Sequence, residues 1–539
     1  MRSLQAQRIE SIKYFRISYL DWVSFPLRGV YMNRYLHAAF VVLLLSLPCL
    51  AYEIKVPVRF DSLSNGLKVL IVPDTNVAVV SCRLYYFVGS MYEGPGTSGL
   101  SHMYEHMMFK GTKRLGTSDF SKEQKWLSKI DSVDALIGRL NNNGVSDTDA
   151  AYKAFKKEIF GYMQSEREFI KKDEIWDIYA GNGGTNLNAW TADDMTAYIV
   201  TLPKNKVELF YWIESDRMQS PVLREFYSER DVVAEERRMR YDNQPANRYE
   251  QYLESLFYMA HPYRLPTIGW MSDIQAYTIK KLYNHIRRFY TPDNALIVLV
   301  GNIDPDAAMR SINAYFSHIP RAAEPKNEVV TREPPPLGET RFIVRENAEP
   351  RIDIMFHTPG YPNDDLYKLE VLEGVLSGRS GRLYNRLITK DNLCVDAGAS
   401  NAIRLHNGYF QVWAALKKET DPAAVEKILL EEIATASKFP PSAREMERIK
   451  NSIRMSFMSN LKSLEGLSDR LAWFQRLGNW KGMLEYPDKI TSVRAIDIPE
   501  IAAKYLKPDY KVIGILLPKI PRAPLEKEKQ PPMHIKKGK

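Results

Sequence analysis

His102, Glu105 and His106 occupy one pentapeptide in the order H-x-x-E-H. On a helix, the two histidines project from nearly the same line along one face. Two imidazoles placed in this way can bind one tetrahedral metal ion, and zinc favours nitrogen and oxygen ligands in that geometry. Glu105 flanks the metal and can accept a proton from a water molecule that the metal activates. The order is the inverse of the commoner H-E-x-x-H zinc helix.

The helix that presents these side chains has recognisable ends. Residues 94–99 form a turn-rich lead-in, in which Thr97 and Ser98 can each cap a helix N-terminus. Lys110 followed by Gly111 is typical of a helix C-terminus. We therefore expect a short helix within residues 100–112.

A catalytic zinc site also needs a third protein ligand. Residues 222–240 have helical periodicity and are rich in glutamate. Glu229 and Glu236 are two turns apart and share one face, whereas Glu235 points about 100° away, toward solvent. Either Glu229 or Glu236 could turn toward the histidines. The alternative for any glutamate in so charged a helix is an exposed position.

Length and composition restrict the class of protein. The chain has 539 residues, of which 45% are hydrophobic and 26% charged, which is typical of a globular protein with two to four domains. Part of the net charge of +9 lies in residues 1–34 and in a basic tail at 521–539. Basic and aromatic residues are not interleaved, so we expect no nucleic-acid binding. Cys82 and Cys394 are far apart and are expected to be buried thiols.

The N-terminal region contains an apolar run of about ten residues at 38–47, followed by the small residues Cys49 and Ala51. This pattern predicts a secretory signal peptide at about 32–51, cleaved before Tyr52, with Met32 as an alternative start. Residues 1–51 are then an N-terminal extension and signal. The run is too short to span a bilayer. We expect a periplasmic or secreted protein with no stable membrane span after cleavage; a signal-anchored protein is the alternative.

A local pattern occurs twice. Tyr290, a Pro-Asp turn and an apolar strand at 295–301 recur as Tyr505, a Pro-Asp turn and a strand at 511–517. This predicts an α+β fold of two related two-layer halves, each a mostly antiparallel sheet with helices on one face. The first half is expected at 52–320 and the second at 341–520, joined by a proline-rich linker at 321–340. The pattern of residues 116–178 predicts an inserted helical hairpin, with helices at 121–140 and 149–172. The hairpin contains no candidate catalytic residues.

Over residues 56–520 the sequence resembles the pitrilysin/insulinase family of inverted-motif zinc peptidases, in its processing-peptidase-like and zinc-protease-like branch. The resemblance is most specific in four segments, namely 99–112, 188–198, 214–238 and 261–269. In the family, chains of this length form half of a clamshell. The resemblance therefore implies a homodimer, or a heterodimer with a related subunit.

The resemblance also implies a zinc-dependent endopeptidase that hydrolyses unfolded peptides or short polypeptides. It makes Glu236 the third ligand of a single zinc ion, beside the two histidines, and Glu105 the general base. Glu229 matches an acidic residue that does not bind the metal itself but supports one of the ligands that do. Asn188 and Ala189 match the edge strand that pairs with an extended substrate peptide.

The chain departs from the family pattern in two places. The separation of His106 from Glu236 is unusually long, and the insertion at 116–178 accounts for the excess. Ile388 and Val395 occupy positions where many members carry an arginine and a tyrosine that hold substrate. The alternative function is therefore a non-catalytic scaffold, or a partner subunit of a heteromeric peptidase or membrane-associated assembly.

Overall fold

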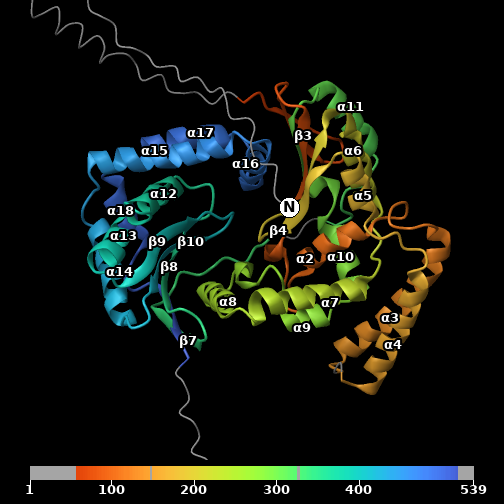
Figure 1. The fold of residues 1–539 in the computed structure, drawn as a ribbon, viewed down its shortest axis with the longest axis horizontal. Helices are drawn as coiled ribbons and strands as arrows, with labels where there is room; N and C mark the ends of the chain where they lie inside the picture. Colours follow the sequence, from red (N-terminus) through yellow and green to blue (C-terminus); the bar gives the residue numbers. More distant parts are fainter. Residues whose placement is uncertain (1–55, 146–147, 325–327, 520–539) are drawn as a thin grey trace, which may run out of the picture. The chain divides into compact units, whose positions relative to one another are not determined.

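The computed structural model describes residues 56–145, 148–324 and 328–519 (Figure 1). The predicted signal at 32–51, the residues before it and the basic tail at 521–539 lie outside the described residues. Within the described part of the chain, no helix combines the length and apolar character needed to cross a membrane. Cys82 and Cys394 are both buried free thiols, as predicted.

The first sheet has six strands in the order β1-β2-β6-β3-β5-β4. Only β2 and β6 pair in parallel, and the other neighbours are antiparallel. The strand that the sequence places at an edge, β4, is the last strand of this order. The strands are β1 (Arg59–Ser62), β2 (Lys68–Pro73), β3 (Val79–Tyr86), β4 (Thr185–Thr191), β5 (Thr196–Pro203) and β6 (Ala295–Gly301).

The second sheet has five strands in the order β7-β11-β8-β10-β9. Here only β7 and β11 are parallel, and the remaining pairs are antiparallel. The strands are β7 (Thr340–Glu346), β8 (Arg351–Thr358), β9 (Cys394–Ala402), β10 (Gly408–Leu416) and β11 (Val512–Pro518).

The repeated Pro-Asp pattern marks equivalent strands of the two sheets. β6 lies between a parallel and an antiparallel neighbour, and β11 lies between the same two kinds of neighbour. Each strand follows a helix that ends in an aromatic residue and a Pro-Asp turn. The prediction of two related α+β halves is confirmed. In the predicted linker, the described residues form no helix or strand until β7 begins at Thr340.

Helices of the first half follow the predicted order. The predicted insertion contains the α3–α4 hairpin, in which α4 ends at Glu166, earlier than the sequence indicated, and it is followed by α5. The remaining helices bring the candidate site together. The bounds are α2 (Leu100–Met107), α3 (Phe120–Asn142), α4 (Ala150–Glu166), α5 (Glu174–Gly181), α6 (Glu208–Gln219), α7 (Phe226–Arg237), α8 (Pro245–Phe257), α9 (Met271–Gln275), α10 (Ile279–Phe289) and α11 (Pro305–Phe316).

The second half contains seven α-helices among the described residues. The bounds are α12 (Asp365–Leu376), α13 (Arg382–Tyr384), α14 (Pro422–Ala436), α15 (Ala443–Asn460), α16 (Leu464–Leu477), α17 (Gly482–Ser492) and α18 (Asp497–Tyr505).

Helix α16 packs on the first sheet, against β3 and β6. The guanidinium of Arg83 donates to Asp469 at 2.7 Å, and the Tyr85 hydroxyl donates to the same carboxylate at 2.7 Å. These β3 residues alternate with Cys82 and Leu84, which belong to the hydrophobic core. The first sheet is therefore covered on both faces, and the second cover comes from the other half of the chain.

Candidate metal centre and general base

Helix α2 carries the two histidines, and its first turn is not capped as predicted. Gly99 precedes the helix at φ +86°, where a Cβ would lie 2.5 Å from the backbone oxygen of Ile268. The buried carboxylate of Glu93 accepts from the N–H of Gly99 at 2.5 Å and from the helix's first turn at 2.7 Å. The prediction that Thr97 or Ser98 caps the helix is wrong. The cap residue is Gly99, and the Ser98 hydroxyl instead donates to Asp273 at 2.6 Å.

His102, His106 and Glu236 converge to form what we term the His–His–Glu cluster. One donor atom from each residue lies within 4.8 Å of the other two. Glu236 Oε2 is 3.6 Å from His102 Nε2 and 3.3 Å from His106 Nε2. His102 is buried, and the other two residues are partly buried.

The spacing of the cluster fits a zinc ion. Tetrahedral zinc with bonds of about 2.0–2.1 Å places neighbouring ligand atoms about 3.4 Å apart, close to both separations from Glu236. Among the described residues, Glu236 Oε2 is buried without a hydrogen-bond partner, as is His102 Nδ1. An orphaned carboxylate oxygen between two imidazole nitrogens is explained by a shared cation. The donor set therefore fits the metal that the sequence predicted.

On helix α7, the side chains of Glu229, Glu235 and Glu236 do not all point in the same direction. Glu236 reaches both histidines, whereas Glu229 reaches only the far nitrogen of His106, Nδ1, at 3.5 Å. The Glu235 side chain is 58% exposed and pairs with Arg238 at 2.8 Å. The two residues on the shared face thus point at the same helix, and Glu235 points to solvent.

Lys110 belongs to the site, although the sequence analysis indicated only that it lies at the end of a helix. Its ammonium lies 2.5 Å from Glu229 Oε1 and 3.5 Å from Glu225 Oε2. Glu229 thus lies between Lys110 and His106, where it can fix the orientation of the imidazole. Arg240 also contacts the cluster, at 3.1 Å from Glu236 Oε1.

The two histidines have opposite pKa shifts. Burial and, to a smaller extent, the neighbouring His106 lower the pKa of His102 to about 4. Burial also disfavours the charged form of His106, but the adjacent carboxylates of Glu229 and Glu236 outweigh it and raise the pKa of His106 to about 9. The neighbouring His106 lowers the pKa of Glu236. The negative charges of Glu229 and Glu236 therefore surround His106. A divalent cation bound there would take the place of its proton.

Glu105 lies beside the cluster and is held by Thr191. The Thr191 hydroxyl, at the end of β4, donates to Glu105 Oε2 at 2.6 Å. Burial raises the pKa of Glu105, and this hydrogen bond partly opposes the shift. A carboxylate with a raised pKa accepts a proton more readily than a free glutamate does. Thr191 lies in segment 188–198, one of the four in which the family resemblance is most specific, but the sequence did not indicate this contact.

The predicted substrate strand, β4, pairs only with β5 among the described strands. Asn188 is exposed, and its side-chain oxygen accepts from the N–H of Ala189 at 2.9 Å. The same strand therefore carries an accessible backbone edge and, at its end, the hydroxyl that contacts Glu105.

Ile388 and Val395 both lie in the second half. Ile388 is partly buried in a π-helical turn, Asn385–Lys390, and Val395 is 62% exposed on β9. Neither side chain can donate a hydrogen bond or carry a charge.

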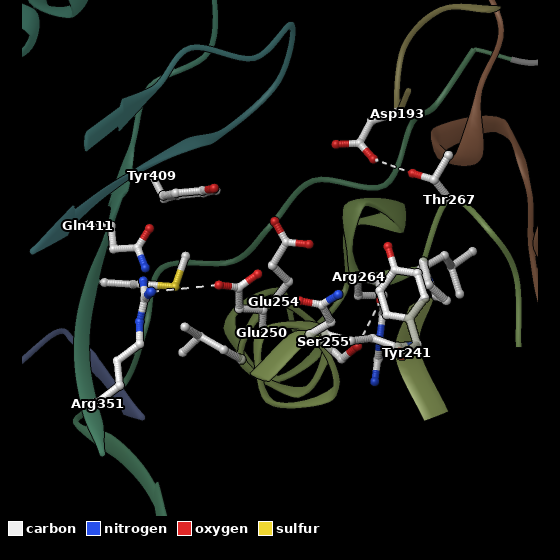
Figure 2. Close-up of a pocket in the computed structure, with 16 residues that line it drawn as sticks. Asp193, Tyr241, Glu250, Glu254, Ser255, Arg264, Thr267, Arg351, Tyr409 and Gln411 are labelled. Carbon is white, nitrogen blue, oxygen red and sulfur yellow. Dashed lines mark hydrogen bonds and ion pairs between the residues drawn. The ribbon is translucent and has the colours of Figure 1, made fainter. Parts of the chain in front are cut away.

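A polar cavity of about 430 Å³ adjoins the β4–β5 turn (Figure 2). It lies between α8 and the second sheet, and Glu250 and Glu254 face it from the helix. Arg404 lies 3.0 Å from Asp193 and 3.2 Å from Glu254, and Arg351 lies 3.8 Å from Glu250, so its carboxylates are partly neutralised. The His–His–Glu cluster contributes no residue to its lining. The cavity is therefore next to the candidate reaction centre but separate from it.

Two family models match the chain. The model described as "Insulinase (Peptidase family M16)" matches residues 68–127, which include the H-x-x-E-H motif. The model described as "Peptidase M16 inactive domain" matches residues 276–453. The first match contains both histidines and Glu105, whereas Glu236 lies between the two matched regions.

Curated relatives are similar over most of the chain. A protein of Helicobacter pylori named "Zinc protease PqqE" is 24% identical over 464 residues, or 85% of this chain and 92% of the relative. An uncharacterised zinc protease of Rickettsia felis is 23% identical, over 83% of this chain and 94% of the relative.

Solved structures share the fold. A protease from Helicobacter pylori aligns with a TM-score of 0.73 and 24% identity, over 86% of this chain and 100% of that one. The periplasmic protease PqqL of Escherichia coli aligns with a TM-score of 0.64 and 18% identity. That alignment covers 86% of this chain but 48% of PqqL.

Proposed function

Because the chain belongs to the M16 (insulinase) family of peptidases, we propose that it is a zinc-dependent endopeptidase acting on unfolded peptides or short polypeptides. The observation that carries the proposal is the convergence of His102, His106 and Glu236, with donor atoms within 4.8 Å of one another, beside Glu105. Three protein ligands leave a fourth position for water or substrate, as a catalytic zinc site requires.

His102, His106 and Glu236 would hold one zinc ion per chain, and Glu229 would orient His106 from its far nitrogen. Bound zinc supplies a Lewis acid that acidifies water and polarises a peptide carbonyl. Glu105 takes the proton of the attacking water and later gives it to the leaving amine. Thr191 holds the carboxylate of Glu105 in position through the 2.6 Å hydrogen bond.

The substrate is proposed to lie along β4, near Asn188 and Ala189. An extended peptide can add to the accessible edge of β4 through backbone hydrogen bonds, which do not depend on its side chains. Because β4 ends at Thr191, a peptide on this edge leads toward Glu105. This geometry favours extended chains over folded domains.

We further propose that the chain acts as a pair, either with a second copy or with a related subunit. The support is that the chain matches 48% of PqqL and 92% of a structure described as the first half of PqqL. A periplasmic or secreted location is supported by the apolar segment at 38–47 and by the periplasmic relative.

The proposal is tested by zinc stoichiometry and by hydrolysis of a quenched peptide library, for the natural protein and for Glu105→Gln. We expect one zinc per chain in both proteins and a loss of about 10²–10⁴-fold in kcat for the variant, because only the proton acceptor is removed. Tight zinc binding without cleavage by the natural protein would instead support the non-catalytic scaffold, which the replacement of the usual arginine and tyrosine by Ile388 and Val395 favours.

A further inference from the structure

Helix α7 is held from the insertion as well as from the body of the first half. Tyr227, 1% exposed, donates to Asp134 of α3 at 2.7 Å. Arg224, just before α7, donates to Glu123 of α3 at 3.0 Å, and both side chains are fully buried. The insertion therefore contacts α7 through buried polar groups, which are costly to leave unpaired.

The end of α4 makes a second set of contacts. Arg167 Nε lies 3.6 Å from Glu225 Oε1, and Arg167 also donates to Ser228 at 3.5 Å. Glu225 is the residue that precedes α7, with its backbone in the left-handed region at φ +55°. These contacts act on the first turn of α7, and those of Tyr227 and Arg224 on the same end.

Charges of alternating sign continue from Arg167 to the His–His–Glu cluster. Glu225 Oε2 lies 3.5 Å from Lys110, Lys110 lies 2.5 Å from Glu229, and Glu229 lies 3.5 Å from His106. Lys110 ends the short 3₁₀ turn, Met108–Lys110, that follows the helix carrying the histidines. The chain of contacts thus connects the insertion, the start of α7 and the end of the histidine helix.

We propose that the inserted hairpin is a brace that sets the position of α7, and with it Glu229 and Glu236, against the histidines. The inference rests on the proposed zinc site. Glu229 and Glu236 lie one and three turns into a helix whose start is fixed by the insertion. A shift or rotation of that start would move both carboxylates relative to α2. Arg167 and Tyr227 are accordingly positioning residues, with no contact to the reacting atoms.

The test measures zinc affinity by competition with a chromophoric chelator, which reports on the site without catalysis. We expect Tyr227→Phe to weaken zinc binding about three- to tenfold, since it removes one buried hydrogen bond. Arg167→Gln should weaken it about two- to threefold because its ion pair is partly exposed, and Arg167→Lys should restore most of that loss. The double variant Arg167→Gln/Tyr227→Phe should lose more than either single change.

Glu158→Gln is the matched control in the same hairpin. It neutralises an exposed carboxylate whose hydrogen bond from Tyr162, at 2.7 Å, does not involve α7, so zinc affinity should be unchanged. Far-UV circular dichroism confirms that each variant is folded before the titration. Folded brace variants that bind zinc as tightly as Glu158→Gln would overturn the brace alone. Failure of the natural protein to bind zinc would overturn the proposed peptidase, and the brace with it.

Discussion

At the scale of residues, Glu229 and Glu236 share one face of α7 but contact different atoms. Glu236 lies near Nε2 of both histidines, whereas Glu229 is opposite Nδ1 of His106. Helical periodicity could exclude Glu235, since it specifies only the direction of a side chain around the axis. It could not choose between two residues on one face, because the choice depends on where α2 crosses α7. The resemblance to the family selected Glu236, and the geometry supports that selection.

The first prediction compares two adjacent glutamates. Glu236→Gln should weaken zinc binding by more than about 100-fold, because it removes a proposed ligand and not only its support. Glu235→Gln should change it by less than about twofold, since that side chain is exposed. Chelator competition on both variants measures the difference. Equal losses would mean that Glu236 is not the ligand.

The second prediction concerns Thr191. Thr191→Val keeps the shape of the side chain but removes the hydrogen bond to Glu105, and we expect kcat to fall about three- to tenfold with little change in KM. Thr191→Ser retains a hydroxyl and should recover most of the activity. Steady-state kinetics on the peptide substrate separates the two constants. A Ser variant as impaired as Val would show that the hydroxyl is not the cause.

At the scale of elements, the insertion has its own buried carboxyl group. Glu166, at the end of α4, is fully buried, and neither carboxylate oxygen has a hydrogen-bond partner among the described residues. Burial and, to a smaller extent, the nearby Glu123 raise the pKa of Glu166 to about 8. Helical periodicity in the sequence located the two helices but gave no sign that one of their glutamates is enclosed.

The third prediction follows from this shift. The folded protein binds the Glu166 proton more tightly than the unfolded chain, whose glutamates titrate near about 4.5. The stability from this group is therefore complete below about pH 4.5 and is lost as pH rises toward 8. In Glu166→Gln, the difference in the free energy of unfolding between pH 6 and pH 9 should be smaller by about 1–3 kcal/mol. Urea denaturation at both pH values checks it, and an unchanged slope would contradict it.

At the scale of the whole molecule, α16 joins the second half to the first sheet. Asp469 accepts from Arg83 and Tyr85, two residues of β3 that face away from the first half's core. Arg83 is only 3% exposed, so its charge depends on this distant carboxylate. The nearly continuous burial of β3 is typical of a strand covered on both faces. The sequence pattern cannot indicate which distant segment provides the second cover.

The fourth prediction tests this connection. Asp469→Ala should lower the free energy of unfolding by about 2–3 kcal/mol, because it leaves the buried Arg83 guanidinium without its partner. Asp488→Ala, at an exposed position of α17, should change it by less than about 0.5 kcal/mol. Chemical denaturation of the two variants provides the comparison. Similar small effects would show that α16 does not stabilise the first sheet through Asp469.

Local spacing in the sequence determined the histidine pair, the adjacent Glu105 and the two related halves, and the resemblance to the family indicated the edge strand. These features depend on the periods of helices and strands and on turn residues, which act over a few positions. The tertiary structure decided which glutamate meets both histidines, that Glu93 caps α2, that Thr191 holds Glu105 and that α16 covers β3. Each of these contacts joins residues whose neighbourhood is created only by packing, because periodicity gives the direction of a side chain but not the element opposite it.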